Sequence, residues 1–368
     1  MAKLRDEDYM KLALRLARRG LGRTSPNPMV GAVIVKDNRI IGEGYHRYFG
    51  GKHAEINAIE QAGEDVAGAT IYVTLEPCSH YGKTPPCVDA VIKHQLGRVV
   101  IGVLDPNPLV SGKSVKMLKE QGIAVTVGVL ETDCRELNEA HFKYMSTRLP
   151  LVTLKFAQTL DGRIATATGS SRGLSSADAQ RFVHRLRTVN DAIMVGVDTV
   201  IADDPRLTTR LVKGRSPLRI ILDSRLRTPR QAKVLTDQEI APTLIATTDK
   251  ADSKKLAKIH ALGMETITIK QNPQGELDLP QILEELGRRG ISSVLVEGGA
   301  KVITSFLREK LADKLVVIIA PKIMGKGIEA VGELNIREVS ESLKLSLTHT
   351  RRLGEDLVIE ARIAQSDD

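Results

Sequence analysis

Three short clusters in the first third of the chain carry side chains that could bind and use a metal ion: His53-Ala54-Glu55, Pro77-Cys78 and Pro86-Cys87. An imidazole and two thiolates suit Zn²⁺, and three protein ligands leave a tetrahedral zinc with one open position, as in catalytic sites. Water in that position is acidified toward neutral pH, and Glu55 would then shuttle its proton. This set of residues predicts hydrolytic deamination of a nucleobase-like ring.

A structural zinc, or two unrelated buried cysteines, is the alternative interpretation. A structural site needs a fourth ligand, for which His80 is the nearby candidate. Residues two apart on a helix point to different faces, so His53 must lie in a first turn for Glu55 to reach the open position. A helix that starts at Pro86 would bring its N-terminus to the metal and favour the Cys87 thiolate.

The two cysteines lie farther apart than in nucleic-acid and cytidine deaminases, which usually separate them by two residues. Here residues 79–86 lie between Cys78 and Cys87. A loop fixed at both ends by metal ligands would be held over the pocket. His80 and Lys83 on this loop could meet a ring edge or a phosphate, and a solvated loop side chain is the open alternative for each.

The composition limits the class of protein. With 368 residues, two domains are expected, and a hydrophobic content of 42% with 27% charged residues is ordinary for a soluble protein. No apolar run approaches the roughly 18 residues that a membrane span needs. Three cysteines, an odd and small number, argue against a disulfide framework and for a cytoplasmic location. The net charge of +8 fits an anionic substrate and a phosphorylated cofactor as well as it fits a nucleic acid.

In the first half of the chain, strands separated by helices predict a mainly parallel sheet covered on both faces. An amphipathic helix is expected near the N-terminus, and Asp37-Asn38 predicts a hairpin turn. The predicted strands are residues 30–36, 39–46, 70–74, 98–104 and 123–127. The other predicted helices begin near His53 and after Cys87 or cover residues 115–121 and 131–147. Arg148-Leu149-Pro150 ends the last helix, which predicts domains at 1–149 and 150–368.

The second half predicts another α/β domain. Its expected strands are residues 151–159, 192–197, 218–222, 243–247, 294–297 and 315–320, followed by a hairpin of 345–348 with 357–363, and its expected helices are 176–188 and one from Ala300. Glu297-Gly298-Gly299 leads into that last helix, where backbone N–H groups could approach a phosphate; a tight connection is the alternative. Arg187 and Arg210 could clamp a ribose phosphate, although either could also be a solvated arginine.

Several motifs resemble a known family, the bifunctional riboflavin biosynthesis deaminase–reductases. The resemblance covers nearly the whole chain. In the first half it is carried by residues 24–28 (Thr-Ser-Pro-Asn-Pro), Gly44-Tyr45-His46, His53-Ala54-Glu55 and the segment from Pro77 to Cys87. In the second half it is carried by residues 155–163, 196–200, 203–205 and 297–299. The resemblance implies a cytidine-deaminase-like α/β/α sandwich followed by a dihydrofolate-reductase-like α/β domain.

The resemblance also implies two successive reactions. The first domain would hydrolyse the 2-amino group of 2,5-diamino-6-(5-phosphoribosylamino)pyrimidin-4-one, and the second would reduce the ribosyl group of the product to ribityl with NADPH. By matching positions, one zinc ion is bound by His53, Cys78 and Cys87, and Glu55 is the proton shuttle. The pyrimidine is contacted by Asn27, His46, His80 and Lys83.

In the reductase half the matching positions form two sets. The substrate set is Ser171, Arg187, Leu207, Arg210 and Glu297, and the cofactor set is Ala157, Gly173, Thr199, Asp203, Ser224, Gly298 and Gly299. Gly173 departs from the pattern, because many relatives carry Trp there. No acid–base pair is evident in this half, which fits hydride transfer to an imine formed by opening of the ribosylamine.

Two functions of other classes are the alternatives to this one. A polynucleotide (tRNA) deaminase would share the zinc motif, but an aromatic content of 3% without Trp gives few platforms for base stacking. A non-enzymatic zinc-stabilised protein would unfold on chelation. We expect small-molecule substrates, neither a nucleic-acid nor a membrane partner, and a homo-oligomer.

Overall fold

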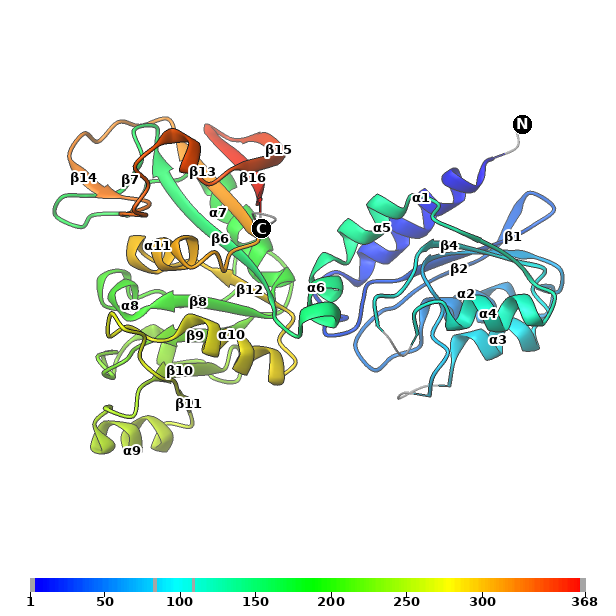
Figure 1. Cartoon of the computed structure of the whole chain (residues 1–368), viewed down its shortest axis with the longest axis horizontal. Coiled ribbons are helices and arrows are strands. Elements are labelled where there is room, and N and C mark those ends of the chain that lie inside the picture. The colour runs from blue at the N-terminus through cyan, green and yellow to red at the C-terminus, as the bar shows by residue number, and fades with distance from the viewer. Residues whose placement is uncertain (1–3, 82–84, 108–109, 365–368) are drawn as a thin grey trace. The chain divides into compact units, whose positions relative to one another are not determined.

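The computed structural model describes residues 4–81, 85–107 and 110–364. The chain divides into two compact units, residues 1–148 and 149–368, each with its own sheet (Figure 1). The division falls one residue before the boundary expected from the sequence.

Unit 1 is built on a five-stranded sheet with the order β2-β1-β3-β4-β5. The strands are β1 (Gly31–Lys36), β2 (Arg39–Tyr45), β3 (Thr70–Leu75), β4 (Arg98–Val103) and β5 (Ala124–Val127). β3, β4 and β5 are parallel, whereas β1 runs antiparallel to both β2 and β3. The prediction of a mainly parallel sheet therefore holds for four of the five strands, and β1 alone runs in the opposite direction. The cause is the predicted two-residue turn, because Asp37 and Asn38 both have positive φ (49° and 60°) and reverse the chain at once.

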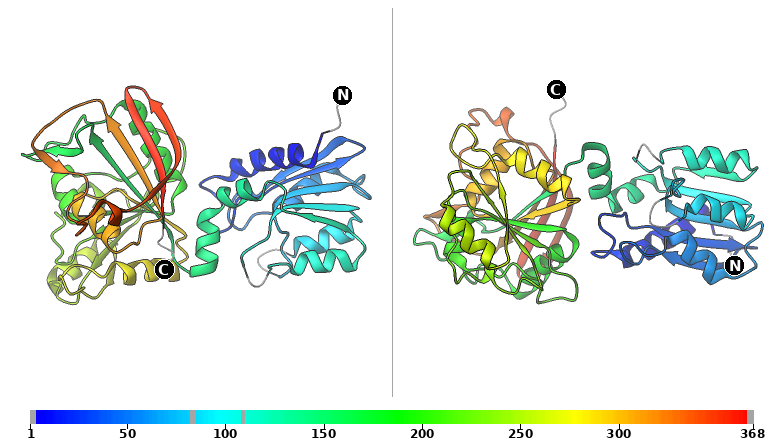
Figure 2. Two further views of the ribbon diagram at one scale, coloured as in Figure 1. Left: turned by 45° about the horizontal axis from the view of Figure 1, so that its top comes forward. Right: turned by 90° about the horizontal axis from the view of Figure 1, so that it is seen from below.

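Helices cover both faces of this sheet, as expected for an α/β/α sandwich. They are α1 (Asp6–Ala17), α2 (Ala54–Ala62), α3 (Cys87–Lys93), α4 (Lys113–Glu120), α5 (Glu131–Leu137) and α6 (Glu139–Thr147). In β1, Ala32 and Ile34 pack toward α2, α3 and α4, while Val33 and Val35 pack toward α1 and α5. Figure 2 shows these two layers from other directions. The alternation follows from the period of two along a strand.

The single helix predicted over residues 131–147 is wrong, because the chain forms two helices that meet at Asn138. The backbone of Asn138 leaves the helical region, with φ −118° and ψ 24°. Its side-chain Oδ1 accepts from the N–H of Met29 and its Nδ2 donates to the carbonyl of Met29, both at 2.8 Å. Asn138 is buried, so this paired contact satisfies the amide while it ends the first helix.

Unit 2 contains a nine-stranded sheet with the order β11-β10-β9-β8-β12-β6-β13-β16-β15. The strands are β6 (Leu151–Thr159), β8 (Ala192–Gly196), β9 (Leu218–Leu222), β10 (Thr243–Thr247), β11 (Glu265–Thr268), β12 (Ser293–Val296), β13 (Lys314–Ala320), β15 (Leu345–Leu353) and β16 (Asp356–Ile363). All neighbours from β11 to β13 are parallel, and the hairpin β15–β16 adds antiparallel to β13. The predicted terminal hairpin is confirmed, whereas β11 was not predicted.

The helices of unit 2 are α7 (Ala177–Val189), α8 (Val197–Asp203), α9 (Ser253–Ala261), α10 (Leu279–Arg288) and α11 (Ala300–Arg308). A separate two-stranded sheet joins β7 (Arg163–Thr166) to β14 (Gly327–Glu329). The helices α7 and α11 begin close to the predicted residues. The side chain of Ser176 caps α7 by accepting from the N–H of Ala179.

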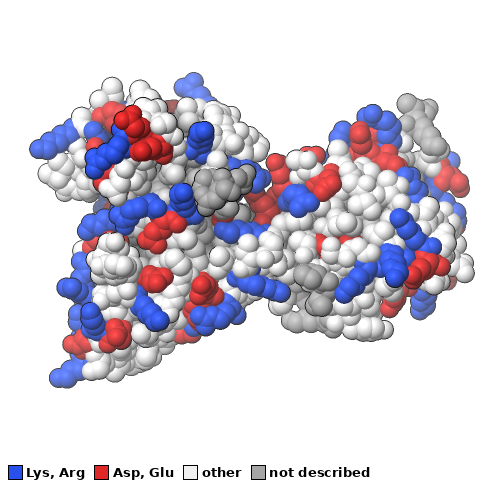
Figure 3. All heavy atoms as spheres, in the orientation of Figure 1, with Lys and Arg blue, Asp and Glu red and all other residues white. Residues whose placement is uncertain are grey.

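Charges on the molecular surface are mixed in sign. On the face drawn in Figure 3, Lys and Arg side chains lie among Asp and Glu side chains and form no continuous block. Among the helices of the described residues, none has the length and apolar character needed to cross a membrane.

Candidate active sites

The three proposed zinc ligands come together in unit 1. His53 is the N-cap of α2, Cys87 is the first residue of α3, and Cys78 lies in the loop after β3. Their ligand atoms all lie within 4.8 Å of one another. Nδ1 of His53 is 3.2 Å from Sγ of Cys87 and 3.5 Å from Sγ of Cys78. A tetrahedral zinc with ordinary Zn–S and Zn–N bonds separates such atoms by about 3.6 Å, so the donor set fits this metal.

The number of candidate ligands distinguishes a catalytic zinc site from a structural one. Within the residues that the structure describes, the group of candidate ligands has these three members, and His80 does not join them. Three donors from one imidazole and two thiols match a site with an open position rather than a closed structural site.

The two thiols share hydrogen bonds in a way that favours one thiolate. Hydrogen bonding with the Cys87 thiol, together with His53 and the Cys87 N–H at 3.2 Å from Sγ, holds the pKa of Cys78 well below its usual value. Hydrogen bonding to Cys78, together with burial, raises the pKa of Cys87. One sulfur is therefore ready to bind a cation, and the second loses its proton when the metal arrives.

Glu55 lies in the first turn of α2 and is 3% exposed. Burial raises the pKa of its carboxyl group, and the neighbouring His53 opposes that shift. A carboxyl group whose pKa is raised holds a proton more readily than a free carboxyl group, which suits a group that must both take up and release a proton. The start of α2 at Ala54 gives His53 and Glu55 the relative position that their spacing requires.

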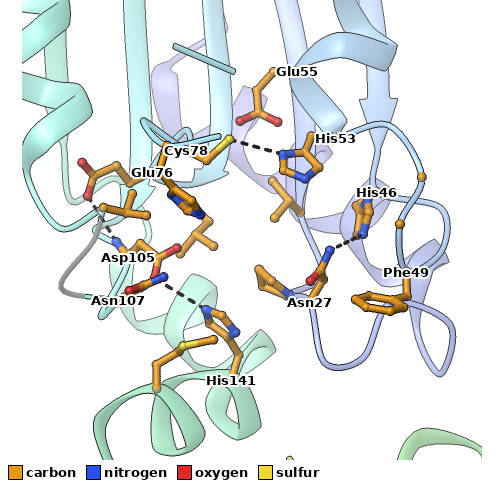
Figure 4. A pocket seen from close by; sticks show the side chains of 18 residues that line it. Asn27, His46, Phe49, His53, Glu55, Glu76, Cys78, Asp105, Asn107 and His141 are labelled. Atoms are coloured by element: carbon orange, nitrogen blue, oxygen red, sulfur yellow. Dashed lines mark hydrogen bonds and ion pairs between the residues drawn. The ribbon is translucent and has the colours of Figure 1, made fainter. Parts of the chain in front are cut away.

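A cavity of about 360 Å³ opens beside these residues, and Figure 4 shows its lining. Asn27, His46 and His80, which the sequence predicted as substrate contacts, line it, while Lys83 lies outside the described residues. Nδ1 of His46 donates to the carbonyl of Lys52 at 3.1 Å, so its Nε2 accepts from Nδ2 of Asn27 at 3.3 Å. Burial lowers the pKa of His46, which keeps the ring neutral in this arrangement.

The cavity also contains polar residues that the sequence reasoning missed, namely Glu76, Asp105, Asn107 and His141. Glu76 accepts from the N–H groups of Asp105 and Gly112 at 3.3 and 3.0 Å and from the hydroxyl of Ser114 at 2.7 Å. It therefore anchors the loop that follows β4. Glu76 and Asp105 lie within two residues of the ends of predicted parallel strands, and that position was a usable signal, since ligands bind at the carboxyl ends of such strands.

A second cavity, of about 680 Å³, lies in unit 2 beside the ends of β8 and β12. It brings together ten of the residues predicted for the reductase half: Ala157, Ser171, Gly173, Arg187, Thr199, Asp203, Leu207, Glu297, Gly298 and Gly299. Arg210 and Ser224 do not line it. Ser224 lines a neighbouring cavity of about 210 Å³ that shares Asp198 and Lys301 with the larger one.

A buried ion cluster forms one wall of the unit 2 cavity. Glu297 accepts from Nε and Nη2 of Arg187 at 2.7 and 3.0 Å, and Nζ of Lys155 is 3.7 Å away. Burial alone would raise the pKa of Glu297, but Arg187 and Lys155 bring it down to about 2. The bidentate partner of Arg187 within the chain is Glu297, while the phosphate clamp by Arg187 and Arg210 stays a prediction. Lys155 was missed as a site residue, although a lysine inside an apolar strand was a visible signal.

Arg210 is positioned by hydrogen bonds of its backbone and of its side chain. Its N–H donates to Nδ1 of the buried His184 at 2.9 Å, and its guanidinium donates to the hydroxyl of Thr208 at 2.9 Å. Burial, helped by Arg187 and Arg210, lowers the pKa of His184 to about 4, so the ring stays a neutral acceptor.

Other residues that line the unit 2 cavity suit a phosphorylated cofactor. Gly299 is the N-cap of α11, and its N–H donates to the hydroxyl of Thr199 at 3.0 Å. A Cβ at Gly298 would lie 2.8 Å from Cβ of Val302, so only glycine allows this close approach. Gly173 has φ +74°, a backbone conformation that suits glycine better than the Trp of many relatives.

Comparison with known proteins agrees with this division. Residues 3–103 match the family model described as the cytidine and deoxycytidylate deaminase zinc-binding region, and residues 150–359 match the RibD C-terminal domain. The riboflavin biosynthesis protein RibD of Aquifex aeolicus is 50% identical over 355 residues, which cover 96% of this chain and 97% of that protein. The Escherichia coli protein of the same name is 38% identical and covers 97% and 99% of the two chains.

Solved structures show the same relationship along the full length. RibD of Acinetobacter baumannii superposes with a TM-score of 0.89 at 38% identity, covering 98% of this chain and 99% of that one. A diaminohydroxyphosphoribosylaminopyrimidine deaminase/5-amino-6-(5-phosphoribosylamino)uracil reductase from Thermotoga maritima gives 0.87 at 40% identity with the same coverage. The presence of both domains favours a bifunctional enzyme over a polynucleotide deaminase with an accessory domain. The chain therefore belongs to the RibD family, the bifunctional deaminase–reductases of riboflavin biosynthesis.

Proposed function

We propose that residues 1–149 deaminate 2,5-diamino-6-(5-phosphoribosylamino)pyrimidin-4-one and that residues 150–368 reduce the ribosyl group of the product with NADPH. The observation that carries the proposal is the meeting of His53, Cys78 and Cys87 beside the buried Glu55, in a chain whose second unit holds a separate cavity. The printed title of the Thermotoga maritima relative names the same pair of reactions for that protein.

In the deaminase step, His53, Cys78 and Cys87 would hold a zinc ion. When bound, zinc supplies a Lewis acid that lowers the pKa of a water molecule in its open position. Glu55 takes the proton from the attacking water and returns a proton to the 2-amino group, which leaves as ammonia. Asn27 and His46 orient the pyrimidine, and the neutral state of His46 fixes which of its nitrogens accepts.

In the reductase step, Gly298 and Gly299 at the start of α11, together with Thr199 of α8, would receive the phosphates of NADPH. The ion cluster of Glu297, Arg187 and Lys155 lines the same cavity and would meet the sugar part of the substrate. If the ribosylamine opens to an imine, the protein has only to align the dihydronicotinamide with an electrophilic carbon and exclude water. Deuterium that reached the reduced carbon from solvent rather than from labelled NADPH would contradict this route.

The test is a two-stage assay on the purified chain with its zinc content measured. Ammonia should appear when the diaminopyrimidine is supplied without NADPH, and NADPH should be consumed only after deamination or when the deaminated pyrimidine is added. Ammonia release without any NADPH use on the deaminated pyrimidine would remove the second half of the proposal. Assembly into a homo-oligomer and a cytoplasmic location stay predictions.

A further inference from the structure

The deaminase cavity contains a histidine that the proposed chemistry does not use. His141, on α6, is 7% exposed and lines the cavity. Both ring nitrogens are buried, and neither has a hydrogen-bond partner within the described part of the chain. A buried imidazole without partners costs free energy, so the fold tolerates it only where something compensates.

Asp105 accompanies this histidine from the end of β4. Its Oδ1 lies 3.6 Å from Nε2 of His141, too far for a hydrogen bond, and accepts from the N–H of Asn107 at 2.8 Å. Asp105 is 9% exposed and lines the same cavity. The pair thus offers one carboxylate acceptor and one imidazole to the cavity.

The position of the pair limits what it can meet. In Figure 4, His53, Cys78 and Glu55 lie at one end of the cavity, and His141 lies at the opposite end. The amino group that is lost must lie beside His53 and Glu55. Asp105 and His141 would then face a substituent that projects from the ring rather than the reacting edge.

The charge of Asp105 indicates whether the pair would meet the phosphate or the hydroxyl groups of that substituent. A carboxylate repels a phosphate group, and it accepts well from a hydroxyl. An imidazole next to it can donate to the oxygen of the same or the adjacent hydroxyl. An acidic side chain that hydrogen-bonds ribose hydroxyls is a familiar arrangement in nucleotide sites.

We propose that Asp105 and His141 form a subsite for the ribose hydroxyls of the deaminase substrate. This inference rests on the proposed function, since it assumes a ribosylated pyrimidine in the cavity. Glu76 positions the subsite, because it binds the backbone N–H of Asp105.

The experiment measures equilibrium binding by calorimetry to the zinc-loaded full chain carrying Glu55→Gln, which keeps the ligand unreacted. Three ligands are compared: the phosphoribosylaminopyrimidine, its dephosphorylated form, and the same pyrimidine with a free 6-amino group. In this background His141→Phe and Asp105→Asn should each weaken binding of both ribosylated ligands about ten-fold, as expected for a lost hydrogen bond that involves a polar or charged partner. Binding of the sugar-free pyrimidine should stay unchanged.

Two controls separate folding from recognition. Zinc content should remain one per chain in every variant, which reports an intact unit 1. His94→Phe is a matched control, because His94 is half-buried in the same unit, outside the cavity, and bonds only its own helix carbonyl at Ala90. His141→Gln, which restores an N–H donor, should recover part of the lost affinity.

Each other outcome contradicts the inference in a different way. Equal weakening for the sugar-free pyrimidine would make the pair a support of the cavity wall. Weakening that disappears with the dephosphorylated ligand would assign the pair to phosphate. If the Glu55→Gln chain itself binds none of the three ligands, the proposed function fails, and that result is distinct from a failure of the subsite alone.

Discussion

At the scale of single residues, a substitution of Glu55 gives the clearest test of whether the two activities are independent. Its carboxyl group is buried next to His53 and Cys87 within unit 1. Glu55→Gln preserves the size of the side chain but cannot carry a proton. Ammonia release should fall by about a hundred-fold to ten-thousand-fold, which is typical for loss of a general acid–base group. NADPH oxidation with the deaminated pyrimidine should persist.

The control for this variant is its zinc content, which should equal that of the unchanged chain. Loss of both activities together would show that the two sites are not independent.

His184 gives a prediction about pH. Its pKa in the folded chain is about 4, below the ordinary value of 6.5, because burial disfavours the charged ring. The unfolded chain therefore binds more protons, so the stability that His184 contributes is fully present above pH 6.5 and is lost as the pH falls toward 4. The urea midpoint of the reductase unit, identified by its shift with NADPH, should decrease across this window.

His184→Gln should flatten this decrease, because the amide does not titrate and can still accept from the Arg210 N–H. An unchanged pH slope in the variant would assign the effect to other groups.

The zinc cluster could be predicted from sequence because its ligand types and spacings are rare in combination. Asp105 and His141 could not be paired in this way, since they come from elements that only the fold brings together. Arg187 shows the opposite case: its chemistry fits a phosphate, but the partner that the fold provides is Glu297. Which charge an arginine meets is decided by tertiary structure.

At the scale of elements, the contact between β2 and α2 determines where His53 and Glu55 lie. A Cβ at Gly44 would stand 2.1 Å from the carbonyl oxygen of Ala54 and 2.5 Å from the N–H nitrogen of Ala58. Gly44→Ala must therefore push α2 away from the strand. We expect a loss of about 1–3 kcal/mol in the free energy of unfolding, together with weaker zinc retention in a chelator competition.

Gly122→Ala serves as the comparison for this variant. Gly122 has φ +74° but nothing within 4 Å of an added Cβ, so only backbone strain would be introduced. That variant should cost about 1 kcal/mol and leave zinc retention unchanged. Equal effects of the two substitutions on zinc would contradict the role given to the β2–α2 contact.

Most strands and helices were predictable because their apolar periods are regular. The exceptions have local causes. The turn at Asp37-Asn38 makes β1 and β2 antiparallel. That β1 also pairs with β3, and runs antiparallel to it, depends on tertiary structure. The helix break at Asn138 depends on Met29, a residue far away in the chain, so no local pattern could reveal it.

At the scale of the whole molecule, the chain has two units with separate cavities. Removal of zinc by a chelator should therefore stop deamination and leave reduction of the deaminated pyrimidine intact. The rate of NADPH oxidation before and after chelation measures this, and re-addition of zinc should restore ammonia release. Global unfolding on chelation would instead support a structural metal.

The link between Asn138 and Met29 has a practical consequence. Asn27, which lines the deaminase cavity, stands just before Met29, and His141 stands one helical turn beyond Asn138. The Asn138 side chain thus connects the segment that carries Asn27 to the helix that carries His141. A variant designed to admit a bulkier ring would therefore change the contact between Asn138 and Met29 first. The zinc ligands and Glu55 would stay as they are.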